Sequence, residues 1–168
     1  MSTARSTPDA AEAAQRLADE VARAMYQDDA AAQALGMRIE AVAPGAATVS
    51  MVVAPGMLNG FRICHGGYIT TLADTAFAYA CNSYDEVTVA SGIVVDFLAP
   101  AAEGERLVAE ARELSRAGRT GVYDITVRDP AGRIVAVMRG RSHTIKGRHI
   151  VRRPEGQAGA AHASRPQR

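Results

Sequence analysis

Several features that define particular protein classes are absent or rare in this sequence. The 168-residue chain has no tryptophan and only 5% aromatic residues, so its core must be built mainly from aliphatic side chains. Its net charge of +1 gives no strong field that would recruit nucleic acid or a membrane surface. No apolar run approaches the roughly 20 residues of a membrane-spanning helix, and the first residues are polar, unlike a signal peptide. We therefore expect a cytoplasmic protein without nucleic-acid or membrane partners.

Cysteine and recognisable cofactor motifs are scarce as well. The two cysteines, Cys64 and Cys81, have no histidines beside them at metal-site spacing, which predicts free thiols in a reducing compartment and no metal site. The chain lacks the G-x-x-x-x-G-K phosphate loop and the G-x-S-x-G turn of serine hydrolases. Nucleotide triphosphate chemistry and the usual serine nucleophile are thus disfavoured.

The residues that are present follow a regular order of helix and strand patterns. Residues 9–35 have helix composition, with a start signal at Thr7-Pro8-Asp9 and a stop at Gly36. Residues 37–54 alternate as two strands about Pro44-Gly45, and a second helix is predicted from residue 66 to about 83. Four further strands are predicted in "EVTVASGIVVDFLAPA", "ERLVAEARELSRAG", "RTGVYDITVRDPAG" and "RIVAVMRGRSHTI". One long helix among six strands predicts an α+β fold, an antiparallel sheet packed on that helix.

We expect three parts along the chain. Residues 1–27 form an N-terminal helical extension, and residues 28–147 form the main domain. The basic segment 148–168 combines arginines with Gly, Pro and Ala, and it has too little apolar surface to fold on its own. We therefore expect a disordered tail there, solvated rather than bound to a polyanion.

Asp74 is the one acidic residue of the helix that begins at residue 66. Its neighbours three and four positions away, Thr70, Thr71, Phe77 and Ala78, provide hydroxyls but no cation. Burial without a cation raises the pKa of a carboxylate, and such acids are enriched at functional sites. The alternative is a structural carboxylate that pairs with a buried arginine or caps a neighbouring helix.

The start of this helix is a second candidate site. The first N–H groups of a helix lack partners within it and carry the positive end of its dipole, and Gly66 and Gly67 would let a ligand approach them closely. Such a site suits an anion or a developing oxyanion, although the two glycines are equally compatible with tight packing.

Asp74 and the helix start can act on the same ligand only if they come from two different chains. Gly66 and Asp74 are eight residues apart, on the order of 12 Å along a helix, so one carbonyl cannot contact both in a single chain. The helix is also apolar on nearly all sides, which one sheet cannot cover. Both observations predict an obligate oligomer.

Two polar residues complete the cluster around the helix start. Asn59 lies in the preceding loop and could donate to a carbonyl or position a water molecule. His65 directly precedes the glycines and could be a base, a donor or a structural residue.

The stretch "HGGYITTLADTAFAYACNS", with "VASGIVVDFLAPA" and "GRTGVYDITVRDPAGRIVAVMRG", resembles the hotdog-fold acyl-CoA thioesterases, in particular the phenylacetate-degradation family. The resemblance covers roughly residues 28–147. It implies a hotdog fold, an antiparallel sheet around a central helix, with two chains joined in a continuous double sheet and dimers paired into homotetramers. It implies hydrolysis of an acyl-CoA thioester without metal or redox cofactor, CoA being part of the substrate.

The resemblance also implies roles for individual residues. Asp74 corresponds to the catalytic carboxylate, as nucleophile or general base, and Gly66 to the residue whose N–H polarises the thioester carbonyl. Asn59 corresponds to the polar loop residue that orients water or substrate, and His65 has a supporting role.

Substrate-binding residues are less sharply indicated. The CoA phosphates require cations, for which Arg116 and Arg119 are candidates, as are Arg139 and Arg141. Gly67 joins Gly66 at the helix start, and Ser91 is a candidate for the acyl end of the pocket. Apolar lining could come from aromatic residues that core packing explains equally well: Phe61, Phe77 and Tyr84.

The resemblance favours aryl-acetyl groups, such as phenylacetyl-CoA and hydroxyphenylacetyl-CoA, in phenylacetate catabolism. Three alternatives remain open: a medium-chain acyl-CoA thioesterase, a hotdog hydratase or dehydratase using His65 and Asp74, and a non-catalytic acyl-CoA-binding protein.

Overall fold

The computed structural model describes residues 8–151 as one six-stranded antiparallel sheet with helices. The helices are α1 (Pro8–Asp28), α2 (Ala30–Ala34) and α3 (Gly66–Asn82), with a 3₁₀ turn at Pro55–Met57. The strands are β1 (Arg38–Ala43), β2 (Ala46–Val52), β3 (Thr88–Phe97), β4 (Arg106–Ala117), β5 (Thr120–Arg128) and β6 (Ile134–Thr144). Their spatial order is β1-β2-β4-β5-β6-β3, which places β3 and β1 at the two edges. The predicted α+β architecture is confirmed.

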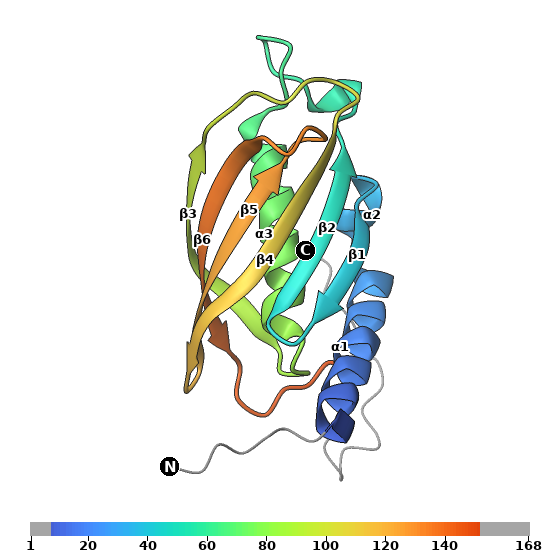
Figure 1. The fold of residues 1–168 in the computed structure, drawn as a ribbon, viewed down its shortest axis with the longest axis vertical. Coiled ribbons are helices and arrows are strands. Elements are labelled where there is room, and N and C mark those ends of the chain that lie inside the picture. Colours follow the sequence, from blue (N-terminus) through green and yellow to red (C-terminus); the bar gives the residue numbers. More distant parts are fainter. Residues whose placement is uncertain (1–7, 152–168) are drawn as a thin grey trace, which may run out of the picture.

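The sheet curves around α3, which contacts all six strands (Figure 1). Alternation along β5 directs Tyr123, Ile125 and Val127 toward the helix, and all three are buried. The ring of Phe77 packs on Tyr123 with 5.2 Å between centroids. Gly140 faces Phe77 so closely that a Cβ there would lie 2.9 Å from the ring. Large aromatic side chains packed against a glycine without a side chain thus allow the helix to lie close to the sheet.

Helix α1 covers the edge of the sheet formed by β1 (Figure 1). Ala18 and Val21 are buried on its inner face. Gln15 Nε2 donates to the Val42 carbonyl at 2.6 Å, and the Tyr26 hydroxyl donates to the Met37 carbonyl at 3.1 Å. These bonds occupy one carbonyl of the edge strand and the carbonyl just before it, acceptors that would otherwise favour pairing with another chain.

The opposite edge, β3, has no such cover within residues 8–151. Its side chains include several exposed apolar ones: Val89 is 47% exposed, Val94 57% and Phe97 53%. A ten-residue apolar edge strand with unpaired backbone groups is an association surface.

The helical region predicted over residues 9–35 is divided at Asp29. The Asp29 carboxylate accepts a hydrogen bond from Ala32 N–H at 3.0 Å and so forms the N-cap of α2. Helix α1 therefore ends one residue earlier, at Asp28. No helix in the described part of the chain is both long and apolar enough to cross a membrane.

The first residues of the segment expected to be a disordered tail, 148–151, contact the domain. Asp85, which is buried in the turn after α3, accepts hydrogen bonds from the N–H groups of Ile150 at 3.0 Å and Val151 at 2.8 Å. His149 lies against the same carboxylate at 3.5 Å. The segment 148–151 is therefore fastened to the domain, and the rest of the predicted tail, 152–168, lies outside the described residues.

Candidate active site

The start of α3 presents one free backbone donor. His65 is the N-cap, with an extended backbone (ψ 133°), and its Nδ1 accepts a hydrogen bond from Gly67 N–H at 2.9 Å. Tyr68 N–H donates to the His65 carbonyl at 2.9 Å. Within residues 8–151 the Gly66 N–H has no acceptor, so it remains available at the positive end of the helix.

This arrangement gives His65 a definite role. Because its Nδ1 accepts a hydrogen bond, the ring proton must reside on Nε2 in the neutral imidazole. The side chain caps the helix and occupies its second N–H, that of Gly67. Gly67 is expected from the sequence to bind substrate, but its N–H is engaged by this cap. The N–H of Gly66 has no such bond to a described residue.

Asn59 organises the loop in front of the helix. Its Oδ1 accepts hydrogen bonds from Phe61 N–H at 2.9 Å and from Ile63 N–H at 3.4 Å. The loop between them includes Arg62 in a left-handed conformation, φ 60°. The two loop N–H groups occupy the amide oxygen and leave the Nδ2 group of Asn59 as the donor that can reach a ligand.

A cavity of about 560 Å³ opens beside Gly66 and Asn59. Its walls are otherwise mainly apolar and include Ile63, Ile69, Phe97 and Leu98. The Phe97 ring lies against the bare Cα of Gly66, since a Cβ built there would be 2.8 Å from its Cζ. Phe97 is not among the predicted site residues, because nothing in the sequence indicates that β3 ends beside the start of α3.

Asp74 lies on a stripe of α3 that the sheet leaves partly uncovered, together with Thr70, Thr71, Thr75 and Ala78. Within residues 8–151 its carboxylate makes no hydrogen bond and no ion pair, and burial raises its pKa. The threonine hydroxyls do not reach it because they donate to helix carbonyls: Thr70 to Gly66 at 2.9 Å and Thr75 to Thr71 at 2.8 Å. Asp74 is thus a half-buried acid without a partner.

The two halves of the predicted site lie on the same straight helix. Gly66 is the first residue of α3 and Asp74 the ninth, which separates them by roughly 12 Å along the axis. One chain therefore cannot apply both groups to one carbonyl carbon.

The other predicted binding residues are spread over the fold. Phe77 is 1% exposed and belongs to the core, so it does not line the cavity beside Gly66. Ser91 lies at an irregularity of β3 and donates to the Arg141 carbonyl at 3.1 Å. Phe61 is 87% exposed at the tip of the Asn59 loop.

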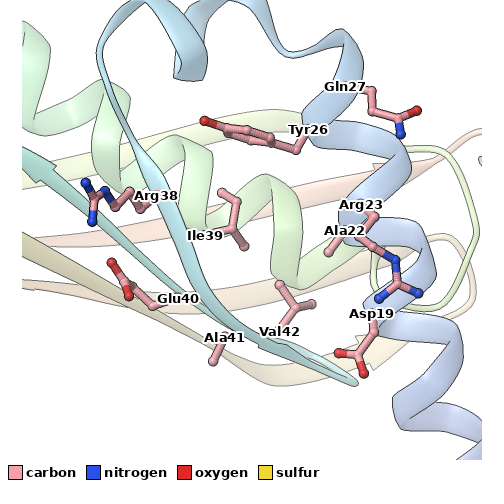
Figure 2. A pocket seen from close by; sticks show the side chains of 10 residues that line it. All are labelled: Asp19, Ala22, Arg23, Tyr26, Gln27, Arg38, Ile39, Glu40, Ala41 and Val42. Atoms are coloured by element: carbon pink, nitrogen blue, oxygen red, sulfur yellow. The ribbon is translucent and has the colours of Figure 1, made fainter.

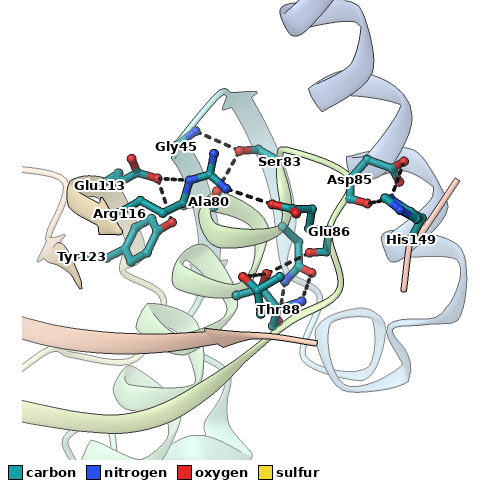
Figure 3. Close-up of polar contacts among 12 residues, drawn as sticks. Gly45, Ala80, Ser83, Asp85, Glu86, Thr88, Glu113, Arg116, Tyr123 and His149 are labelled. Carbon is teal, nitrogen blue, oxygen red and sulfur yellow. Dashed lines mark hydrogen bonds and ion pairs between the residues drawn. The ribbon is translucent and has the colours of Figure 1, made fainter. Parts of the chain in front are cut away.

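Two of the four candidate arginines have their guanidinium groups engaged. Arg116 pairs with Glu86 at 2.9 Å, beyond the C-terminal end of α3 (Figure 3). Its guanidinium group also stacks 4.0 Å above the ring of Tyr84. Arg139 forms a bidentate pair with Asp124, which raises the arginine's pKa. Arg119 and Arg141 are exposed and make no ion pair with any described residue.

The cysteines are poorly suited to nucleophilic attack. Burial raises the pKa of Cys64, and it raises that of Cys81 to about 12, so both thiols are protonated at neutral pH. Among the described residues no group of three or more His, Cys, Asp or Glu side chains is arranged to hold a metal ion.

A second cavity, of about 550 Å³, lies between α1 and β1 (Figure 2). Its charged lining residues balance, with Asp19 and Glu40 opposite in sign to Arg23 and Arg38. It shares no residue with the cavity beside Gly66.

A sheet wrapped around one central helix, with a free N–H at the helix start and an unpartnered acid on its open face, defines a hotdog-fold protein of the thioesterase type. Residues 61–136 match the family model described as the thioesterase superfamily. The chain is 48% identical over 126 residues to acyl-coenzyme A thioesterase PaaI of Escherichia coli (strain K12), covering 75% of this chain and 90% of that protein.

Solved structures agree with this match. The E. coli PaaI protein from the phenylacetic acid degradation operon superimposes with a TM-score of 0.79 at 46% identity, covering 80% of this chain and 97% of that one. A mutant of phenylacetic acid degradation protein PaaI from Thermus thermophilus gives a TM-score of 0.65 at 33% identity, over 68% of this chain and 97% of that one.

The chain therefore belongs to the hotdog-fold thioesterase superfamily, among the PaaI-type acyl-CoA thioesterases, and is a thioester hydrolase. The predicted family resemblance is confirmed. The hydratase and the non-catalytic binding protein are disfavoured accordingly.

Proposed function

We propose that this protein hydrolyses aryl-acetyl-CoA thioesters, such as phenylacetyl-CoA and its ring-hydroxylated relatives, to the free acid and CoA in cytoplasmic phenylacetate catabolism. The proposal is supported by the 48% identity to E. coli acyl-coenzyme A thioesterase PaaI and by the likeness to the protein of the phenylacetic acid degradation operon. The observation that carries it is the free Gly66 N–H at the mouth of an apolar cavity.

The chemistry divides between two groups. The thioester carbonyl oxygen accepts the Gly66 N–H, which makes the carbonyl carbon more electrophilic and stabilises the oxyanion that forms on attack. Asp74 supplies the second half. As a general base it takes a proton from water, whose oxygen adds to the carbonyl carbon, and it returns the proton to the departing thiolate. The Asn59 Nδ2 group donates to the carbonyl or to the attacking water.

Asp74 can act instead as the nucleophile, forming an acyl anhydride that water opens. A single turnover in ¹⁸O-labelled water tests the nucleophile route. Label in the peptide that contains Asp74 shows that an anhydride formed and that water opened it at the aspartyl carbon. Label confined to the product acid fits the general base, and it fits equally an anhydride that water opens at the acyl carbon.

We further propose that the working site is shared between two chains. The β1 edge is capped by Gln15 and Tyr26, whereas the apolar β3 edge is open. Antiparallel pairing of two β3 strands would extend the sheet and bring the uncovered faces of two α3 helices together, with Gly66 of one chain near Asp74 of the other. Association of two such dimers into a tetramer belongs to the same proposal.

The same pairing suggests where CoA binds. The start of β3 pairs with the end of β6, and Thr144 N–H donates to the Arg119 carbonyl at 2.8 Å. In an antiparallel dimer these residues would approach the other chain's Gly66. Arg119 and Arg141, which lack ion pairs among the described residues, are therefore better placed than Arg116 and Arg139 to bind the CoA phosphates. Ser91 lies at the same end of β3.

No metal or redox cofactor is needed for this chemistry, because both the electrophilic and the basic task have a candidate group in the chain. Incubation with excess EDTA is therefore expected to leave the rate of CoA release unchanged.

The test of the proposed function is release of free thiol from a panel of acyl-CoAs, aryl-acetyl against straight-chain, by the native protein and by Asp74→Asn. Aryl-preferring release that is lost in the variant supports the proposal. A preference for medium straight chains would keep the mechanism and replace the substrate. Undiminished release by Asp74→Asn would rule out the mechanism.

A further inference from the structure

The cavity beside Gly66 has a composition that restricts what it can hold. Among the described residues that line it, none is Lys or Arg, and Asn59 is the one side chain with strong hydrogen-bonding groups. The diphosphate and 3′-phosphate of CoA need cations, and the two amides of the pantetheine arm need donors and acceptors. An uncharged, largely apolar group fits this lining, and in an acyl-CoA that group is the acyl moiety.

Phe97 occupies the position next to the reacting carbonyl. Its ring touches the Cα of the residue whose N–H is free, with Cζ, Cε1 and Cε2 at 2.8, 3.2 and 3.2 Å from a Cβ built on Gly66. A carbonyl oxygen bonded to this N–H thus has the ring beside it. Since Phe97 is 53% exposed, one side of the ring remains free to contact a ligand.

Segment 97–101, the cavity wall that contains Phe97, is held in place by hydrogen bonds within the chain. The N–H groups of Leu98 and Ala99 donate to the Val135 carbonyl at 2.8 and 3.2 Å. Arg133 Nη2 donates to the Pro100 carbonyl at 3.1 Å, and its Nε is held by Asp129 at 2.9 Å.

The end of this wall is tied to the loop before α3. Cys64 N–H donates to the Ala101 carbonyl at 2.8 Å. Segment 97–101 is therefore braced on both sides, by the β5–β6 hairpin and by the Asn59 loop. A braced wall loses little entropy on binding and can discriminate shapes.

We propose that this cavity holds the acyl group and that Phe97 is the residue that selects an aryl group over a straight chain, an inference that rests on the proposed thioesterase function. Two aromatic rings in edge or offset contact gain affinity beyond their buried area, equivalent to about threefold to tenfold in kcat/KM. A straight acyl chain gains only the affinity that comes from burying its apolar area.

The test compares Phe97→Leu with Phe61→Leu. The first removes the ring and keeps an apolar side chain. The second makes the same exchange at the 87% exposed ring that does not line the cavity. Each protein is assayed with phenylacetyl and hexanoyl thioesters, both as CoA esters and as N-acetylcysteamine esters, which lack the nucleotide and most of the pantetheine arm.

We expect Phe97→Leu to lower the ratio of kcat/KM for phenylacetyl over hexanoyl by at least about threefold, equally with both thiols, while Phe61→Leu keeps the native ratio. Thermal unfolding of each variant verifies that it is folded. Weaker binding of phenylacetate to Phe97→Leu than to the native protein, measured by calorimetry, would support the same conclusion without turnover.

Two results would overturn the inference. Equal losses on both acyl groups would show that Phe97 does not select. A loss that is confined to the CoA esters would place the pantetheine arm in the cavity. In both cases the native enzyme still releases thiol, so the proposed function stands. Absence of thiol release by the native protein with every ester would instead remove the proposed function, and the inference with it.

Discussion

At the scale of single residues, Asp74 costs the folded chain stability. Burial raises its pKa above the value in the unfolded chain, so the folded chain binds this proton more tightly. The stability linked to the proton is complete below the unfolded pKa, near 3.9, and is lost as the pH rises through the folded pKa. At neutral pH the charged carboxylate therefore lowers the free energy of unfolding relative to a neutral isostere.

We accordingly expect Asp74→Asn to raise the thermal midpoint at pH 7, by about 2–4 °C for each kcal/mol gained, while kcat falls at least about 100-fold. The stability difference should shrink below about pH 4, where the native acid is also protonated. Calorimetry at the two pH values measures it. In the native enzyme, kcat/KM should fall toward acid with a midpoint above that of an ordinary aspartate. An unfolding midpoint lowered by the substitution at pH 7 would contradict this account and indicate a hidden partner for the carboxylate.

The Gly66 N–H can be tested with a matched pair of substitutions. Gly66→Ala and Gly66→Pro both place a Cβ where the Phe97 ring tip now lies, but only proline removes the N–H. Proline is well tolerated at the first helical position, and the extended backbone of His65, ψ 133°, suits a residue before proline.

We expect Gly66→Pro to be slower than Gly66→Ala by about 100-fold to 1,000-fold in kcat, the typical cost of one oxyanion donor. Steady-state rates with phenylacetyl-CoA measure the difference, and far-UV circular dichroism verifies the helix. Similar rates for the two variants would mean that this N–H does not bind the carbonyl.

At the scale of elements, the β5–β6 hairpin supports the wall of the cavity. Arg133 connects Asp129 in this hairpin to the Pro100 carbonyl after β3. Arg128 provides a control, because its Nη1 donates at 3.0 Å to Gly132 within the same hairpin.

Loss of the bond to Pro100 should loosen segment 97–101 without unfolding the sheet. We expect Arg133→Gln to speed hydrogen exchange there and to lower kcat/KM by about twofold to tenfold, mainly through KM, while Arg128→Gln changes neither. An unchanged exchange rate at Leu98 and Ala99 in Arg133→Gln would show that the hairpin is not the support.

The elements themselves follow from local patterns. Alternation and turn residues predict six strands, and the run from Gly66 predicts the helix, because these signals are local. What could not be predicted depends on register and on distant partners. Phe77 and Phe97 look alike in the sequence, yet one is buried under Gly140 and the other lies on Gly66. The irregularity between Ala90 and Gly92 decides which side of β3 faces the helix.

Partners that are far away in the sequence limit the prediction of polar roles as well. Arg116 is a candidate for CoA from the sequence, but Glu86, thirty residues earlier, occupies its guanidinium (Figure 3). The sequence leaves His65 open between base, donor and structural residue, and its Nδ1 contact with Gly67 N–H assigns it to the cap. In the sequence, Asp29 looks like an ordinary helix residue. In the structure its carboxylate accepts a hydrogen bond from Ala32 N–H, and this N-cap starts a new helix at the point where α1 ends.

At the scale of the whole molecule, the two edges of the sheet are treated differently. Side chains of α1 donate to the carbonyl of Val42 in β1 and to that of Met37 just before it, whereas β3 exposes Val89 and Val94. The open stripe of α3 carries Asp74, the proposed catalytic acid, roughly 12 Å along the helix from the Gly66 N–H proposed to bind the carbonyl. The proposed second chain would account for both facts, because it would cover the apolar edge and supply the missing half of each site.

This arrangement predicts complementation between two inactive proteins. Asp74→Asn keeps the helix start, and Gly66→Pro keeps the acid. In a mixed dimer, one site combines the intact Gly66 of the first chain with the intact Asp74 of the second, and the other site lacks both groups. We therefore expect each pure variant to be nearly inactive and the purified mixed dimer to recover up to half of the native rate per dimer.

Two differently tagged chains are expressed together and purified through both tags, and native mass spectrometry of the dimers, after any tetramer has been dissociated, establishes that each dimer contains one of each chain. Phenylacetyl-CoA turnover of this preparation is compared with that of the two pure variants at equal site concentration. If Gly66 and Asp74 of the same chain formed the site, every site in the mixed dimer would carry one defect and no activity could return. Recovery is thus possible only when the helix start and the acid are contributed by different chains.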